Sequence, residues 1–279
     1  MSGQTFGPIA ARPAPPRVRR GINGQRVLGY AVIAVMALLG LGIALFLYTS
    51  WDLAFVEKYG PKYLDGLSIT IQLVGISIVL GAMLSFPVAL GRMSSNPIVR
   101  PVSFAYVYFF RGTPLLAQIF LVYYGAGVFV AELKAIGLWG FFREPWNCAV
   151  LTFSLNTAAY QAEILRGAID SVPRGQWEAA KALGLNRFQT FRRIILPQAL
   201  IVALRPYGNE IILMIKGSAI VAIITVLDLM GETRRAFSRT YDFQTYIWAA
   251  IFYLIIVEAL RIGWDRLERH LTRHLKREG

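Results

Sequence analysis

Long apolar stretches separated by shorter polar segments dominate the chain. The first covers residues 27–48, about 22 positions without a charge, which as a helix spans a hydrocarbon layer of roughly 30 Å. Further stretches of spanning length lie at about 66–91, 113–131, 146–168, 198–224 and 244–264. Only helices cross a membrane singly, because lipid offers no partners for open backbone groups. The pattern therefore predicts an all-α integral membrane protein with six transmembrane helices.

Composition supports this interpretation. Hydrophobic residues make up 56% of the 279 positions and charged residues 16%, whereas soluble domains carry about a quarter charged residues. The net charge of +13 lies mostly between or beyond the apolar stretches, which favours membrane lipid over nucleic acid as the partner. Residues 1–26 are rich in Pro and Arg and predict a disordered basic tail. Residues 27–48 are too long for a signal peptide and lack a small-residue cleavage site before Trp51, which indicates an uncleaved helix.

Basic residues also predict the orientation. An N-terminus in the cytoplasm places most later basic residues inside by alternation of the spans. This inner set comprises Arg92, Arg100, Arg174, Lys181, Arg187, Arg192, Arg193, Arg266, Arg269, Arg273, Lys276 and Arg277. One outside loop, with Arg234, Arg235 and Arg239, is an exception. Both termini, including the tail at 269–279, are therefore expected in the cytoplasm.

Two helix starts are marked by proline. The aromatic segment 99–110 is too short to cross and is expected to lie in the cytoplasmic interface. It ends at Arg111-Gly112-Thr113-Pro114, where Thr113 as N-cap and Pro114 in the first turn would begin the third span. Leu196-Pro197 gives the same start signal for the fifth span.

The loop at 170–197 has helical signals of its own. Residues 178–183 are strong helix formers, and Gly184 follows where a helix would end. Apolar residues then recur at helical spacing at Phe188, Phe191, Ile194 and Ile195. Two short amphipathic helices joined at a glycine would form a rigid projection suited to docking in a groove of another protein.

The same loop carries a known signature. Its residues Glu178, Ala179, Ala180, Gly184, Ile194, Leu196 and Pro197 match the EAA motif in type and spacing. The EAA motif is the signature of permease subunits in binding-protein-dependent ABC importers, and the chain resembles these subunits over roughly residues 65–275. Three further stretches, at 110–125, 156–184 and 209–220, resemble the members of this family that import histidine, arginine, glutamine and opines.

The resemblance implies a five-helix permease domain at 65–268, preceded by an additional helix at 27–48 and located in the bacterial inner membrane. It implies that the loop 170–197 is a coupling helix resting on an ABC ATPase subunit. The expected partners are two ATPases, a second identical or homologous permease and an extracytoplasmic solute-binding protein. The chain has no GxxxxGK[ST] phosphate loop, so ATP and Mg are expected on the ATPase, with no cofactor bound by this chain.

Polar residues inside two spans define a candidate substrate path. Asn156, Tyr160 and Glu163 share one helical face, and Asn209 and Lys216 mark a second polar stripe. Glu210 lies beside that stripe. Opposed carboxylate and ammonium groups would suit a zwitterionic amino acid at mid-membrane. The alternative is packing, with Glu163 paired to Arg166 and Lys216 paired to Glu210 or to a neighbouring subunit.

Other classes of function fit less well. An ion- or proton-coupled secondary carrier would have internal repeats, and no second copy of any motif is found. An intramembrane enzyme would need a catalytic set, but HExxH and GxSxG are absent. Cys148, the sole cysteine, is expected to be buried and inert. His270 and His274 are two ligands among basic residues, which does not predict a metal site.

Overall fold

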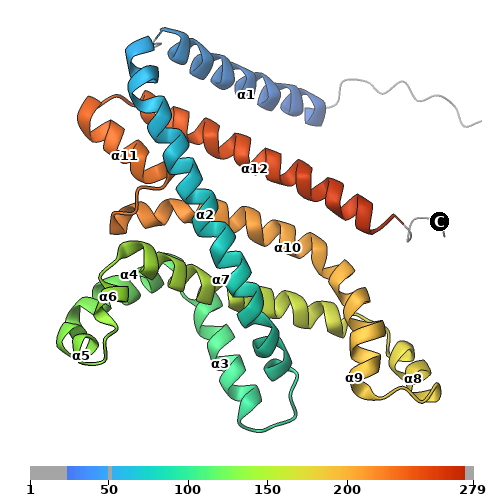
Figure 1. Ribbon diagram of the computed structural model, residues 1–279. Helices are drawn as coiled ribbons and strands as arrows, with labels where there is room; N and C mark the ends of the chain where they lie inside the picture. The colour runs from blue at the N-terminus through green and yellow to red at the C-terminus, as the bar shows by residue number, and fades with distance from the viewer. Residues whose placement is uncertain (1–23, 50–51, 274–279) are drawn as a thin grey trace, which may run out of the picture. The chain divides into compact units, whose positions relative to one another are not determined.

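The computed structural model describes residues 24–49 and 52–273, and all regular structure there is helical (Figure 1). The α-helices are α1 (Gly24–Thr49), α2 (Leu53–Arg92), α3 (Val99–Gly112), α4 (Leu115–Ala126), α5 (Val130–Ala135), α6 (Trp139–Phe142), α7 (Pro145–Asp170), α8 (Arg174–Ala182), α9 (Arg187–Thr190), α10 (Leu196–Ser218), α11 (Leu229–Thr240) and α12 (Gln244–Leu271). The all-α prediction is confirmed. Helix α1 forms one unit and the remaining helices form a second. The expected basic tail and His274 lie largely or wholly outside the described residues.

Five segments are long and apolar enough to cross a membrane. These are Gly24–Thr49, Leu53–Arg92, Leu115–Ala135, Arg187–Ile224 and Gln244–Leu271. They contain five of the six apolar stretches expected from the sequence. The remaining stretch, 146–168, forms the 26-residue helix α7, which is long enough but richer in polar side chains.

Helix α7 forms the centre of the second unit. It packs along α2 and also contacts α10, α4 and α3 (Figure 1). Small residues on α7, among them Ala158, Ala159 and Ala162, are fully buried and allow the neighbouring helices to approach closely. Gly81 of α2 faces this surface, and a Cβ atom there would lie 2.4 Å from Cγ2 of Thr157. The α2–α7 crossing therefore requires a glycine.

The predicted break after Arg111 is present, but Thr113 does not cap the next helix. Helix α3 ends at Gly112 and α4 begins at Leu115, while the Thr113 hydroxyl donates back to the Phe109 carbonyl at 2.7 Å. The break is stabilised instead by Gln118, whose amide donates to the Phe110 carbonyl and to Thr113. The expected N-cap was wrong because the hydroxyl closes the preceding helix.

The loop between α7 and α10 is helical, as expected. Helix α8 ends before Gly184, which has a φ of +75° that favours glycine. Helix α9 continues through a π-helical turn, Phe191–Ile195, directly into α10. Helix α10 begins at Leu196 with Pro197 in its first turn, so the predicted start is confirmed, and the π turn joins it to α9 without a break. Residues 174–195 are named the α8–α9 hairpin below.

Helix α11 lies at the opposite end of this unit from the α8–α9 hairpin (Figure 1). From the sequence this segment was predicted only as a loop. Asp228 caps it, since its carboxylate accepts from the Gly231 N–H at 2.8 Å, and burial raises the pKa of Asp228 to about 6. A Cβ on Gly66 of α2 would lie 2.8 Å from the Asp228 carbonyl, so the cap packs directly against α2. Asp228, an N-cap residue type directly before Leu229, was the available sequence signal for this helix.

Candidate functional site

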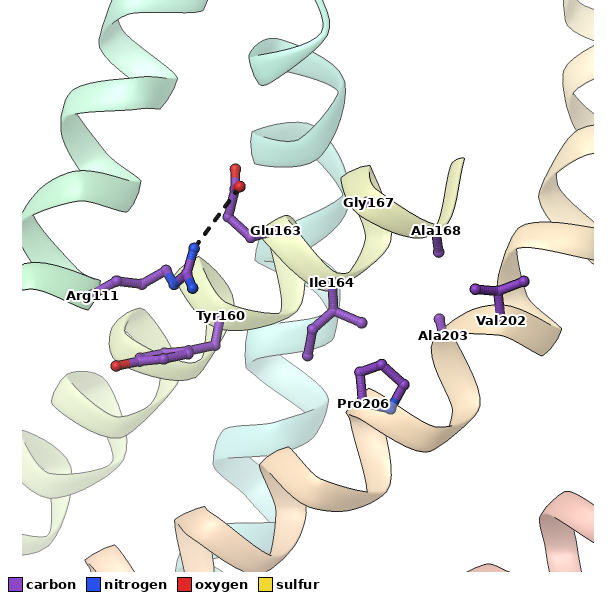
Figure 2. Close-up of a pocket in the computed structure, with 9 residues that line it drawn as sticks. All are labelled: Arg111, Tyr160, Glu163, Ile164, Gly167, Ala168, Val202, Ala203 and Pro206. Carbon is purple, nitrogen blue, oxygen red and sulfur yellow. Dashed lines mark ion pairs between the residues drawn. The ribbon is translucent and has the colours of Figure 1, made fainter. Parts of the chain in front are cut away.

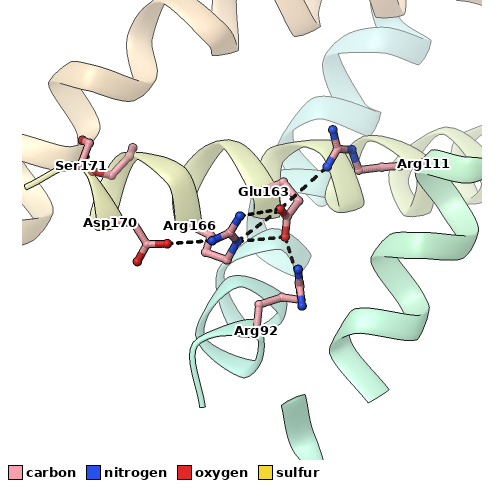
Figure 3. Close-up of polar contacts among 7 residues, drawn as sticks. Arg92, Arg111, Glu163, Arg166, Asp170 and Ser171 are labelled. Atoms are coloured by element: carbon pink, nitrogen blue, oxygen red, sulfur yellow. Dashed lines mark hydrogen bonds and ion pairs between the residues drawn. The ribbon is translucent and has the colours of Figure 1, made fainter. Parts of the chain in front are cut away.

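Glu163 is the centre of a cluster of arginines from three helices (Figure 3). Its carboxylate accepts from Arg92 of α2 at 2.9 Å and from Arg166 of α7 at 3.0–3.2 Å. Arg111 of α3 approaches it to 3.8 Å, and Arg166 also pairs with Asp170 at 2.7 Å. The alternative pairing of Glu163 with Arg166 is therefore present. Glu163 joins α2, α3 and α7 about 10 Å along the axis from the end of α7.

A pocket of about 400 Å³ lies beside this cluster (Figure 2). Arg111, Tyr160 and Glu163 form its polar side. Its other lining residues are Ile164, Gly167, Ala168, Val202, Ala203 and Pro206. The Arg111 guanidinium lies 5.2 Å from the centre of the Tyr160 ring. The pocket thus combines two of the expected path residues with a largely apolar wall from α7 and α10, and its volume is in the range of small-molecule sites.

Asn156 does not join this pocket. It is buried, and its side-chain amide donates to the Phe110 carbonyl at 3.0 Å and to the Gln118 side chain at 2.9 Å. These bonds connect α7 to the break between α3 and α4. Gln118 was missed by the sequence reasoning, although a lone amide side chain in an apolar helix is a signal of such a contact.

Glu210 is also buried, on the side of α10 that faces α7. It accepts a hydrogen bond from the Thr157 hydroxyl at 2.8 Å, and Thr157 in turn accepts from Gln161 at 3.0 Å. No ion pair joins Glu210 to Lys216 among the described residues. Glu210 therefore connects α7 to α10 inside the helical bundle, and the expected packing pair with Lys216 within the chain is not formed.

Asn209 and Lys216 lie on the exposed side of α10. Five of the exposed residues of α10 recur at helical spacing: Val202, Pro206, Asn209, Leu213 and Lys216. Val202 and Pro206 belong to the pocket wall, so the same helical face continues from the pocket to Lys216. Ten residues separate Pro206 from Lys216 in the sequence, which corresponds to roughly 15 Å along the helix.

The signature residues of the α8–α9 hairpin and of the first turn of α10 lie mostly at the surface. Glu178, Ala179, Gly184 and Pro197 are exposed, Ile194 and Leu196 are half-buried, and Ala180 is buried. Leu183 and Phe188 are exposed by 79% and 70%, although they lie outside the apolar stretches that the sequence predicts to span the membrane. Glu178 also borders a groove of about 560 Å³ together with Asp170, Arg174 and Trp177. The hairpin therefore presents an apolar tip at the surface.

Residues 74–277 match the family of binding-protein-dependent transport system inner membrane components. The chain belongs to this family. It is thus an inner-membrane permease component of such a transport system, and the recognition made from the signature is confirmed. The expectation that the ATPase is a separate subunit is confirmed with it.

The permease is similar to several curated proteins. It is 45% identical to the nopaline transport system permease protein NocM of Agrobacterium fabrum, over 74% of this chain and 86% of the relative. It is 43% identical to the histidine/lysine/arginine/ornithine transport system permease protein HisM of Salmonella typhimurium, over 75% and 90% of the two chains.

Solved structures agree with the fold. A crystal structure of an amino acid ABC transporter with histidines matches with a TM-score of 0.70 and 33% identity, over 79% of this permease and 99% of that chain. An inward-facing MetNI methionine ABC transporter structure matches with a TM-score of 0.63 over 76% and 96% of the chains, and its 19% identity supports the fold alone.

The sole cysteine does not line the pocket, and the described residues form no candidate metal site. Cys148 is buried, as expected, and its thiol donates to the Phe142 carbonyl at 3.2 Å. Within residues 24–49 and 52–273, no group of three or more His, Cys, Asp or Glu side chains is arranged to hold a metal ion. The pocket chemistry of this part of the permease consists of guanidinium, phenol and carboxylate groups.

Proposed function

We propose that this permease forms the membrane pathway of an ATP-driven importer of polar amino acids or opines. The observation that carries the proposal is the family match over residues 74–277, together with relatives named for nopaline and for histidine, lysine, arginine and ornithine. The pocket between α7 and α10 supports it, because a polar side next to an apolar wall suits an amino acid with an aliphatic portion.

The proposed topology has six spans, five in the permease domain at 65–268 and one from α1. Helix α7 is the sixth span, and its polar side chains are accommodated because they face other helices. Both termini and the α8–α9 hairpin lie on the cytoplasmic side, where the basic residues concentrate. Helix α11, with Arg234 and Arg235, lies on the external side.

The α8–α9 hairpin is proposed as the coupling element, within the loop 170–197. Its exposed Leu183 and Phe188 would enter a groove of the ATPase subunit, with Glu178 beside the contact. The importer would contain two permeases, two ATPases that bind ATP and Mg, and an external solute-binding protein. Closure of the ATPases would move the two hairpins together and turn the pathway outward, where solute is received.

The proposed substrate path follows the exposed face of α10. Tyr160 and Glu163 border the pocket, and Asn209 and Lys216 continue the path away from it. An exposed lysine in lipid costs roughly 2.5–3.5 kcal/mol, so Lys216 favours a water-filled path or a partner. Asn156 and Glu210 belong to the path as supports, because their buried hydrogen bonds fix α7 against its neighbours.

Uptake by reconstituted importer tests this function. The complete complex in liposomes should accumulate labelled arginine, histidine or nopaline when ATP and the solute-binding protein are supplied. Replacing residues 178–184 by a Gly/Ser linker should leave the permease folded and abolish accumulation, because the docked hairpin transmits the motion. Accumulation by the permease alone under an ion gradient would establish the alternative, a secondary carrier.

A further inference from the structure

The carboxylate of Glu163 is already neutralised within the chain. Arg92 and Arg166 donate to it at 2.9–3.2 Å, and its side chain is only 14% exposed. A ligand ammonium group would have to displace one of these guanidinium groups. Glu163 therefore serves as an anchor for arginines, and the group that recognises a ligand has to be sought among its neighbours.

Arg111 is the arginine of this cluster that keeps bonding capacity. Its guanidinium stands 3.8 Å from Glu163, beyond hydrogen-bond distance, and its side chain is 44% exposed. By contrast, Arg92 is 16% exposed and hydrogen-bonded to Glu163. Arg111 also lies against the Tyr160 ring, which restricts its position. It is thus a positioned cation that makes no hydrogen bond to another residue of the described part of the chain, and it borders the pocket.

Arg111 is the least compensated cation of the cluster. Arg92 and Arg166 are hydrogen-bonded to the carboxylates of Glu163 and Asp170, whereas Arg111 approaches Glu163 only to 3.8 Å. The buried Glu210 is a further carboxyl group that acts electrostatically on Arg111, and it is already hydrogen-bonded to Thr157. A planar guanidinium matches a carboxylate in geometry as well as in charge.

We propose that Arg111 binds a carboxylate of the transported solute in the pocket between α7 and α10. The apolar wall, with Ile164 and Val202, then receives the aliphatic portion of the solute. The site therefore binds solutes that have a free carboxylate, including opines, which have two. It discriminates against amines that have no carboxylate. This inference rests on the proposed import of amino acids or opines and names the group by which the permease recognises them.

Binding to the purified permease–ATPase complex, without solute-binding protein, tests the inference. The probes are L-arginine, L-argininamide, in which the carboxylate is a neutral amide, and octopine, in which the amino group carries a carboxyethyl substituent. The wild type should bind arginine at least about tenfold more tightly than argininamide, and octopine at least as tightly as arginine. Arg111→Gln should remove this preference while leaving argininamide binding unchanged, and Arg111→Lys should keep part of it.

Arg100→Gln is the matched control, since Arg100 is an exposed arginine of the same helix that lies outside the pocket. It should bind all three probes like the wild type. A preference for carboxylates retained in Arg111→Gln, or no binding of any probe to the wild-type complex, would overturn the inference. ATP-driven uptake by the complete wild-type importer separates the two proposals. If the wild-type importer takes up no solute, the import function is refuted. If it takes up solute but Arg111→Gln keeps the wild-type preference among the probes, only the role of Arg111 is refuted.

Discussion

Replacing Gly81 by alanine should disrupt the crossing of α2 and α7. The added Cβ would lie 2.4 Å from Cγ2 of Thr157 and 2.9 Å from the amide nitrogen of Gln161. Thr157 cannot rotate away without loss, because its hydroxyl donates to Glu210 at 2.8 Å and accepts from Gln161 at 3.0 Å. Either the helices separate or this buried hydrogen-bond chain breaks.

The expected cost of Gly81→Ala is about 1–3 kcal/mol in the free energy of unfolding, the usual range for an extra methyl group in a packed core. By the scaling for domains of 150–250 residues, each kcal/mol lowers the unfolding midpoint by roughly 2–4 °C. Cys148 offers the assay, because it is the sole cysteine and is buried. Labelling by a thiol-reactive dye during heating, read on the permease band after electrophoresis, reports the midpoint.

Two further variants make the test specific. Gly75→Ala on the same helix is the control, since apart from its own helical backbone no atom of the described residues lies within 4 Å of a Cβ there, and it should not lower the midpoint. Thr157→Ser removes Cγ2 and keeps the hydroxyl, so it should restore most of the stability lost in Gly81→Ala. Equal midpoints for Gly81→Ala, Gly75→Ala and the wild type would refute the reasoning about close helix packing.

Three other predictions concern single positions. Gly184→Ala should destabilise the α8–α9 hairpin by roughly 1–2 kcal/mol, because Gly184 has a φ of +75°. Tryptic cleavage of the hairpin should then be faster than in the wild type, whereas Gly175→Ala should leave the cleavage rate unchanged. Equal cleavage rates for the two variants would contradict this prediction. Because burial raises the pKa of Asp228 to about 6 from an ordinary 3.8, the folded state favours the protonated acid. Wild-type stability relative to Asp228→Asn should therefore fall by roughly 3 kcal/mol as pH rises from about 4 to 7, and a pH-independent difference in thermal midpoint would exclude it. Glu163→Gln should lower the free energy of unfolding by roughly 1.5–3 kcal/mol, because the Glu163 side chain is only 14% exposed, and Asp170→Asn by less than about 1 kcal/mol, because Asp170 is 52% exposed. A larger loss of thermal midpoint for Asp170→Asn than for Glu163→Gln would contradict this prediction.

Hydrophobic length and local turn chemistry were sufficient to predict the long apolar helices and the α8–α9 hairpin, but not α11. The apolar stretch at 146–168 became α7, and the break after Arg111 is where the sequence placed it. The wrong prediction of an N-cap at Thr113 concerns a hydroxyl with two possible hydrogen-bond partners. It could accept from an N–H of the following helix or donate to a carbonyl of the preceding helix. It donates to the preceding helix, and the side-chain amide of Gln118 occupies the break.

The candidate site was predicted in composition but not in arrangement. Helical periodicity placed Asn156 and Glu163 on one face, and it cannot distinguish a residue buried against α3 from one that borders a pocket. That distinction depends on which helix packs on each side of α7. Arg111 was assigned only to the membrane interface, because its proximity to Tyr160 and Glu163 arises from contacts across 49 to 52 residues of sequence.

Burial divides the polar residues of the membrane helices into two functional groups. Asn156 and Glu210 have partners within the chain and are buried, so they contribute to the rigidity of the bundle. Arg111 and Lys216 are exposed, and each would be costly in lipid. Helix α10 connects the two positions, because Pro206 borders the pocket of Arg111 and Lys216 follows on the same face. Arg111 of α3 and Lys216 of α10 are thus exposed cations at two positions of the proposed path, which suits a solute whose carboxylate is passed from one cation to the next.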